Sequence, residues 1–102
     1  MFTTYKRWTL REGRNETELV DLVSNRTIPH FEKLNSNVKL GLLRIEGTRS
    51  YLALQHWPNR ELWESTMSSE AFQSWYDEYQ PILQDWDSMM AFESEWESEE
   101  LI

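Results

Sequence analysis

Apolar residues recur with two different spacings along this chain, and the change of spacing marks its elements. Between Phe72 and Trp86 they fall at positions 72, 75, 76, 79, 83 and 86, which is one face of a helix. The preceding run, Tyr51 to Trp57, is mainly apolar, as in a buried strand. Pro58 and the residue after it separate the two runs. We therefore expect a strand, then a short helix and then a long one.

The N-terminal third begins with the same alternation of strand and helix signals. Residues 2–11 are rich in threonine and aromatic side chains and contain no breaker, which predicts a first strand. Asn15, followed three positions later by a glutamate, is a capping-box start for a helix that runs to about Asn35. Pro29 lies inside this helix and lacks a backbone donor. We expect a kink or break near residues 27–28.

Two further strands complete the pattern. Residues 38–46 are apolar on both faces, with a switch at Leu42–Leu43 that a bulge near Gly41 or cover on both faces would explain. Residues 89–97 alternate cleanly, which predicts a last strand with one solvated face. Its two faces are expected to carry Met90, Phe92 and Trp96 and, opposite them, Glu93, Glu95 and Glu97. We interpret the acidic side as an edge-strand surface and not as a metal site.

The predicted order is βαββαβ, the α+β ferredoxin-like arrangement of one domain over residues 1–102. Right-handed crossovers place both helices on one face of a four-stranded antiparallel sheet. The other face would then expose a large apolar patch in a monomer. Burying it against a second copy gives a homodimer whose sheets close into a dimeric α/β barrel.

Composition removes several classes of function. The net charge is −8, and residues 50–102 hold one basic and twelve acidic residues, against nine basic and six acidic in residues 1–49. Such a surface repels phosphate backbones, so we expect no nucleic-acid partner. The asymmetry could draw the two halves together, across the fold or a subunit contact, although solvated acidic faces are the simpler interpretation.

The lack of cysteine and of a membrane-spanning stretch limits the possible chemistry and location of the protein. The chain has no cysteine, which excludes disulfides, thiolate metal sites and cysteine nucleophiles. No stretch approaches the roughly 20 apolar residues of a membrane span, and the first residues enter a strand without a leader pattern. We therefore expect a cytoplasmic protein with no membrane partner.

Three stretches carry a resemblance to a known family. They are Leu54-Gln-His-Trp-Pro-Asn-Arg-Glu-Leu-Trp-Glu, Ser68-Ser-Glu-Ala-Phe-Gln-Ser-Trp-Tyr and Pro81-Ile-Leu. In this order the chain resembles the antibiotic biosynthesis monooxygenase-like domains of the dimeric α/β barrel superfamily, over nearly its whole length. The haem-degrading members place an asparagine on the first strand and a histidine on the later helix, and this chain has neither.

The resemblance implies chemistry without a metal, flavin or other cofactor. Its monooxygenases help to deprotonate an electron-rich phenol, anthrone or quinol, which then meets oxygen. The leading hypothesis is thus a cofactor-independent monooxygenase acting on an aromatic or quinol-like small molecule. The alternative is a non-catalytic small-ligand-binding or stress-related dimeric barrel. An isomerase or decarboxylase on the same scaffold is a third option.

In such a fold the ligand would lie between the helices and the sheet or inside the barrel. His56 is the candidate catalytic base because histidine titrates near neutral pH, and it shares a strand face with Leu52 and Leu54. A strand-end histidine bonded to backbone or solvent is the plainer interpretation. His30 is expected to cap or pack. The candidate substrate-binding residues are Tyr5, Trp8, Arg44, Trp57, Trp63, Phe72 and Trp75.

Two of these candidates have structural alternatives. Trp57 and Trp63 are more typical of a core than of a ligand wall. Arg44 interrupts an apolar strand and would either anchor an anionic substrate or bond to the glutamates of the last strand.

Overall fold

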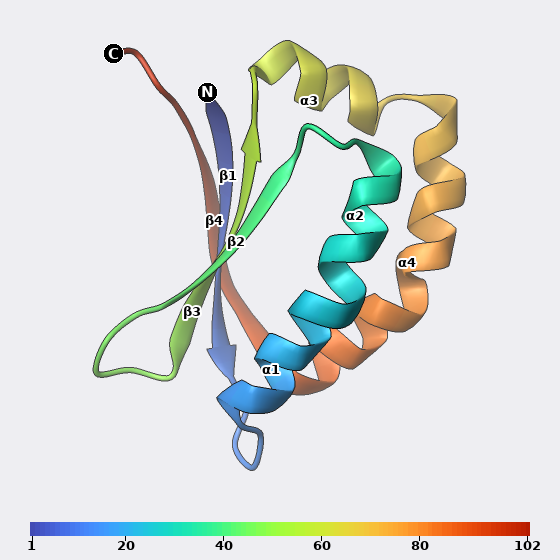
Figure 1. Ribbon diagram of the computed structural model, residues 1–102. Coiled ribbons are helices and arrows are strands. Elements are labelled where there is room, and N and C mark those ends of the chain that lie inside the picture. Colours follow the sequence, from blue (N-terminus) through green and yellow to red (C-terminus); the bar gives the residue numbers. More distant parts are fainter.

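The computed structural model describes all 102 residues and has the predicted order of strands and helices. The elements are β1 (Phe2–Leu10), α1 (Glu16–Leu22), a π-helical turn (Val23–Thr27), α2 (Ile28–Leu34), β2 (Lys39–Arg44), β3 (Ser50–Trp57), α3 (Arg60–Met67), α4 (Glu70–Met89) and β4 (Met90–Glu99). The four strands form one antiparallel sheet in the order β2-β3-β1-β4. All helices lie on one face of this sheet, and the other face is bare (Figure 1). The α+β ferredoxin-like prediction is confirmed.

The first helical segment departs from α-helical geometry just before Pro29. Asn15 Oδ1 accepts a hydrogen bond from Glu18 N, and the Glu18 carboxylate accepts one from Asn15 N, which completes the capping box. The helix widens into the π-helical turn over Val23–Thr27, and Pro29 then lies in the first turn of α2. A proline is tolerated there because a first-turn residue needs no backbone donor.

The long helix α4 continues through Pro81 without a break. Ser69 occupies its N-cap position, but the hydroxyl donates to Thr66 O instead of capping the helix. At α3 a side-chain cap does form, since Asn59 Oδ1 accepts from Leu62 N at 2.7 Å.

The core between helices and sheet is divided into two clusters. One lies where α1, the end of α4 and the start of β4 meet the sheet, and contains Leu10, Leu19, Leu22, Tyr51, Ile82, Trp86, Met89 and Met90. The other lies where α2 and the start of α4 meet the opposite end of β1 and β3, and contains Phe2, Phe31, Val38, Trp57 and Trp75. Tyr79 packs against both. The space between the helices and the sheet is therefore not filled by one continuous hydrophobic cluster.

A bulge in β4 changes which side chains face the helices. Trp8 pairs with Phe92, and Arg7, the residue before Trp8 on β1, pairs with Ser94. Glu93 therefore has no partner of its own on β1 and is an extra residue of β4. The prediction that Glu93, Glu95 and Glu97 share a solvated face is therefore wrong. Glu93 bonds Arg7 at 2.9 Å on the bare face, whereas Glu95 and Glu97 stand opposite residues of β1 that face the helices. After the bulge, Trp96 lies on the bare face.

In β2 the expected bulge is absent. The strand pairs with β3 in unbroken register, so Leu40 and Leu42 face the helices and Leu43 faces the bare side. Leu43, on the face without helices, is 50% exposed.

Opposite charges from the two halves of the chain do meet in the fold. Besides Arg7 and Glu93, Lys6 lies 3.9 Å from Glu95, and Arg26 contacts Asp85. These pairs are largely exposed, so each contributes little to stability. No helix in the structure has the length and apolar character needed to cross a membrane.

Candidate functional site

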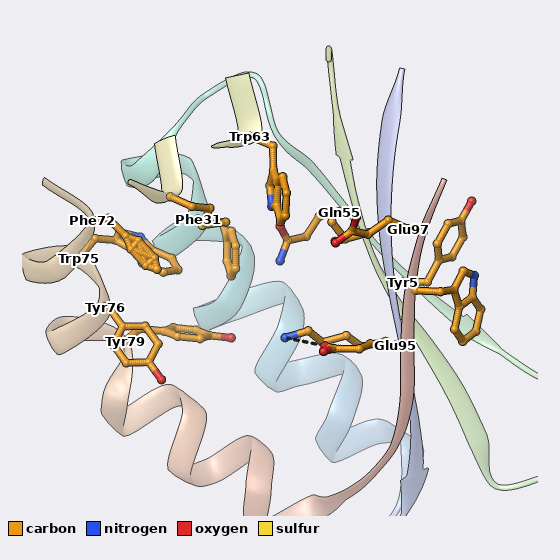
Figure 2. A pocket seen from close by; sticks show the side chains of 14 residues that line it. Tyr5, Phe31, Gln55, Trp63, Phe72, Trp75, Tyr76, Tyr79, Glu95 and Glu97 are labelled. Carbon is orange, nitrogen blue, oxygen red and sulfur yellow. Dashed lines mark ion pairs between the residues drawn. The ribbon is translucent and has the colours of Figure 1, made fainter. Parts of the chain in front are cut away.

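A cavity of about 640 Å³ lies between the sheet and the helices, in the space that the two core clusters leave (Figure 2). We call this the wide lobe. A second space of about 200 Å³, the narrow lobe, adjoins it along β1, β2 and β3. The residues that line both lobes are Thr4, Lys6, Phe31, Gln55, Tyr76 and Tyr79. Because they share these walls, we describe the lobes as one cavity of a size that suits a small organic ligand.

The helical wall of the wide lobe is aromatic. Its rings are those of Phe31, Trp63, Phe72, Trp75, Tyr76 and Tyr79 (Figure 2). Trp75 lies nearly parallel to Tyr79 at 5.0 Å between ring centroids, and Phe31 meets Trp75 edge-on at 4.8 Å. Such stacked and edge-on pairs form a rigid apolar surface. The wall suits the flat face of an aromatic ligand.

Two hydrogen bonds hold this wall in place. Trp75 Nε1 donates to His30 O at 2.7 Å, and His30 Nε2 lies 2.9 Å from Trp75 O. A carbonyl accepts only, so Nε2 carries the proton. The buried His30 ring also stacks on Trp75 at 4.7 Å, which agrees with the expectation that this histidine packs.

The opposite wall, formed by the sheet, is polar. It carries Thr4 and Lys6 from β1, Gln55 from β3, and Glu95 and Glu97 from β4. Lys6 Nζ lies 3.9 Å from the Glu95 carboxylate, drawn as the dashed line in Figure 2. Lys6 is the only cation that lines either lobe, and the two glutamates are the only anions. The cavity thus sets one ion pair against an aromatic wall.

The neighbouring charges divide into two pairs. Glu97 lies 3.8 Å from Arg60, whose Nε donates to Glu99 at 2.7 Å. Arg60 also lies over the Phe2 ring, 4.8 Å from its centroid. Because Glu97 lies beside Arg60, Glu95 is the carboxylate that pairs with Lys6.

Tyr79 brings a protonated phenol to the helical wall. Burial raises the pKa of Tyr79 to about 12, and the negative charge of Asp87 adds to the shift. The phenol is therefore neutral throughout the physiological range and can act as a hydrogen-bond donor but not as a base.

Most of the aromatic candidates from the sequence do line the cavity. Trp63, Phe72 and Trp75 border the wide lobe, and Trp8 borders the narrow lobe. Tyr5 borders the wide lobe at β1, but its ring stacks on Trp96 at 5.4 Å and points away from the helices (Figure 2).

Two other candidates have structural roles. Trp57 is fully buried in the core, and its Nε1 donates to Gln55 Oε1 at 3.0 Å, so it positions a cavity side chain without lining the cavity itself. Arg44 binds Glu16 of α1 through two bonds of 2.6 and 2.9 Å and also bonds Glu46. The alternative partners on β4 are excluded because β2 and β4 are the two opposite edges of the sheet.

His56 lies outside the cavity. It does share a face with Leu52 and Leu54, but that face is the bare one, and His56 Nδ1 lies 3.0 Å from the Thr3 hydroxyl. The expectation that it points inward is not met. Sequence reasoning missed Lys6, which alternation on residues 2–11 could have placed beside Trp8, and Glu95, which the bulge concealed.

Comparisons with known proteins identify the fold. No family profile matches the chain, and no curated protein matches it in sequence. Among solved structures, HapK from Hahella chejuensis superposes with a TM-score of 0.68 at 17% identity, over 99% of this chain and 93% of HapK. SnoaB, a cofactor-independent oxygenase from Streptomyces nogalater, gives 0.66 at 16% identity, over 97% and 91% of the two chains.

A proposed antibiotic biosynthesis monooxygenase from Nitrosomonas europaea aligns over the whole of both chains, with a TM-score of 0.57 and 11% identity. At these identities the likeness is one of fold. The chain has the fold of the antibiotic biosynthesis monooxygenase-like proteins, as the sequence resemblance implied.

Proposed function

We propose that this chain, which shares its fold with a cofactor-independent oxygenase, is itself a cofactor-independent monooxygenase of an aromatic or quinol-like small molecule. The observation that carries the proposal is the Lys6–Glu95 pair facing an aromatic wall across a cavity of about 640 Å³. One wall would hold the ring system, and the other offers a proton acceptor beside a cation.

In the proposed complex the substrate ring lies on Trp75 and its neighbours, with its acidic position at Glu95. The side chains of Lys6 and Glu95 are 48% and 62% exposed, so water weakens their interaction in the free protein. A bound ring displaces that water, so the ammonium and carboxylate groups act on the ligand through a less polar medium. Binding thereby strengthens the interaction of Lys6 with an anion that forms when Glu95 takes a proton from the substrate.

The proposed reaction starts from a ring CH₂ group made acidic by the aromatic system. Glu95 takes one proton, Lys6 stabilises the resulting anion, and the anion gives one electron to O₂. The substrate radical and superoxide combine into a C–O bond, and the peroxide takes back the proton. Loss of the second C–H proton breaks the O–O bond, leaving a ring carbonyl and one molecule of water. One oxygen atom is thus incorporated and the other reduced, with no further reductant.

A homodimer is also part of the proposal. The bare sheet face carries Tyr5, Leu43, Leu52 and Trp96, with Leu43 half-exposed and the Tyr5–Trp96 stack on the surface. A second copy placed face to face would cover these side chains and leave each cavity on the outer side of its own sheet.

The test is oxygen uptake with an anthrone that bears ring hydroxyl groups. We expect protein-dependent uptake, a fall of roughly two to four orders of magnitude for Glu95→Gln, and a fall of roughly tenfold to a hundredfold for Lys6→Met. Glu99→Gln is the matched control, because it is the same change on the same strand at a residue that does not line the cavity. Equal activity of the Glu95→Gln variant and the wild type would remove Glu95 from the mechanism.

A non-catalytic ligand-binding protein is the second candidate, favoured by the partial exposure of the ion pair. It predicts that aromatic ligands bind in the cavity while oxygen uptake stays at the protein-free rate. Measured binding without turnover would therefore replace the monooxygenase proposal with this one.

A further inference from the structure

The Gln55 side chain forms part of the wall that the two lobes of the cavity share. It comes from β3, on the sheet face that the helices cover, and it lines both the wide and the narrow lobe. It reaches toward the aromatic wall with its amide group at the free end (Figure 2). A ligand in either lobe can therefore contact this amide.

A single hydrogen bond fixes the orientation of the Gln55 amide. Trp57 Nε1 donates to Gln55 Oε1 at 3.0 Å, and an indole N–H can only donate. Turning the amide over would place its NH₂ group against the indole N–H, with no acceptor between the two nitrogens. The amide oxygen therefore faces Trp57, and the NH₂ group is left for another partner.

Trp57 is a rigid anchor for this bond. Its side chain is fully buried and belongs to the cluster that contains Phe2, Phe31 and Trp75, so the ring cannot turn without repacking of that cluster. Trp57 follows Gln55 by two residues on β3, which places both side chains on the same face of the sheet. The amide is thus held in position before a ligand binds.

The amide nitrogen of Gln55 has no acceptor in the protein, since the only hydrogen bond of this amide is the one that its oxygen accepts. The nitrogen is also accessible. Nε1 of Trp8 is the only buried side-chain nitrogen or oxygen that lacks a partner, so Gln55 Nε2 is not a buried atom. Two N–H donors of a cavity-lining side chain are therefore open to a ligand.

The donor at Gln55 and the acceptor at Glu95 lie on different strands of the polar wall. Thr4 on β1 is the direct partner of Gln55, and Lys6 follows two residues later on the same face. Glu95 lies beyond β1, on the edge strand β4, where it pairs with Lys6. Gln55 and Glu95 are thus two strands and two residues apart, roughly 12 Å between Cα atoms. A ligand of two or three fused rings can touch both with opposite edges.

We propose that Gln55 Nε2 binds the oxygen of a ring ketone and so sets the orientation of the ligand, with Trp57 as its positioning residue. The inference rests on the proposed function in using the same cavity, and it names aromatic ketones as the ligand class. The oxygen faces Gln55, and the opposite edge of the ring system lies beside Glu95. A hydrocarbon of the same shape would cover the two donors without offering an acceptor, which weakens its binding.

The test compares 9-fluorenone with fluorene, which have the same three-ring shape and differ in one carbonyl group. Equilibrium dialysis measures their affinity for the wild type and for Gln55→Met, which keeps the length of the side chain and removes the donor. We expect the wild type to bind fluorenone roughly tenfold tighter than fluorene. Gln55→Met should abolish that preference without weakening the binding of fluorene.

Gln73→Met is the matched control for this comparison. It is the same change at an exposed residue of α4 that lines neither lobe. It should keep the wild-type preference for fluorenone. Loss of the preference in this variant as well would mean that Gln55→Met acts through the fold and not through the lost donor.

A second variant tests the anchor. Trp57→Phe removes the indole donor and keeps an aromatic ring in the core. The amide can then rotate, and the preference for fluorenone should fall to roughly threefold or less. A merely structural role of Trp57 would instead weaken the binding of both compounds by the same factor.

The amide group can also be observed directly. The side-chain ¹⁵N–¹H₂ pair of signals that disappears in Gln55→Met belongs to Gln55. In the wild type one of its two proton signals should move downfield with fluorenone and not with fluorene.

The remaining outcomes separate the two proposals. Equal binding of both compounds by the wild type would overturn this inference and leave the aromatic cavity in place. A preference that survives Gln55→Met and is lost in Lys6→Met would also overturn it, by assigning the ketone oxygen to Lys6. If neither compound binds, the proposed function fails, and this inference fails with it. A preference that depends on Gln55, in a protein that consumes no oxygen, would keep this inference and remove the monooxygenase.

Discussion

The Thr3 hydroxyl lies 3.0 Å from Nδ1 of His56, and both residues alternate with the cavity-lining Thr4 and Gln55, which puts their side chains on the face that carries no helix. Thr3 and His56 are direct partners in the ladder between β1 and β3, so their side chains lie next to each other on the same face of the sheet. The sheet therefore stands between the histidine and the aromatic cavity. A proton acceptor for a ligand in the cavity must come from another residue.

The first prediction follows from this separation. His56→Ala should leave the affinity of the cavity for 2-naphthol within about twofold, whereas Trp75→Ala should weaken it roughly tenfold or more by removing part of the aromatic wall. Titration of tryptophan fluorescence measures both, with circular dichroism to confirm that each variant is folded. A large loss of affinity in His56→Ala would place the histidine in contact with the ligand.

The second prediction concerns acid stability and the contact between α1 and β2. Hydrogen bonds from Arg44 and Tyr51 lower the pKa of Glu16 to about 2 from its usual value of 4.5. A lowered pKa stabilises the fold above pH 4.5, and that stabilisation is lost as the pH falls from about 4.5 to 2. Arg44→Ala should therefore unfold at higher pH than the wild type in an acid titration followed by circular dichroism.

The matched control for this prediction is Glu46→Gln, which removes the other partner of Arg44 and keeps the pair with Glu16. It should unfold close to the wild-type pH. Equal shifts in both variants would mean that the pair of Arg44 with Glu46, which both variants lose, governs acid unfolding, and not the bond to Glu16.

The third prediction is a late-titrating phenol. Because burial raises the pKa of Tyr79 to about 12, part of the phenolate absorbance should appear only near that pH, and Tyr79→Phe should remove this late step. The pKa is raised, so the associated stability is complete below pH 10 and is lost as the pH rises through about 12. A wild-type titration complete near pH 10 would contradict the buried position of this ring.

The fourth prediction tests the bare face as a subunit contact. Leu43→Glu puts a charge on its most exposed leucine and should weaken self-association at least tenfold, measured by light scattering over a concentration series. Val20→Glu is the control, since Val20 is similarly exposed, at 45% against 50%, but lies on α1 on the helical side. A wild-type protein that is monomeric at all concentrations would end the dimer proposal.

The fold could be predicted because local signals agree with it. The period of the α4 stripe, the Asn15 capping box and the alternation in β3 each depend on neighbouring residues, and each is found in the structure. Alternation also put His56 on the same face as Leu54. It could not say which of the two faces the helices would cover, because that depends on how the layers pack.

The same reasoning could not predict the polar wall of the site, because a bulge changes the alternation of β4. Strict alternation assigns Glu95 and Glu97 to solvent, and nothing in residues 89–97 marks Glu93 as an extra residue. The bulge is visible only when β4 is paired with β1. Lys6, in contrast, shares the parity of Trp8, so alternation alone could have placed it among the inward residues.

The bulge also makes the character of the cavity depend on strand register. If β4 kept all its residues but paired with β1 without the bulge, Glu93 would stand opposite Arg7, and every later side chain of β4 would turn to the opposite face. The Trp96 ring would then enter the cavity, and Glu95 and Glu97 would leave it. A slip of one residue could thus convert a charged binding wall into an aromatic one and, in the same step, place acidic groups on the face proposed to join two subunits.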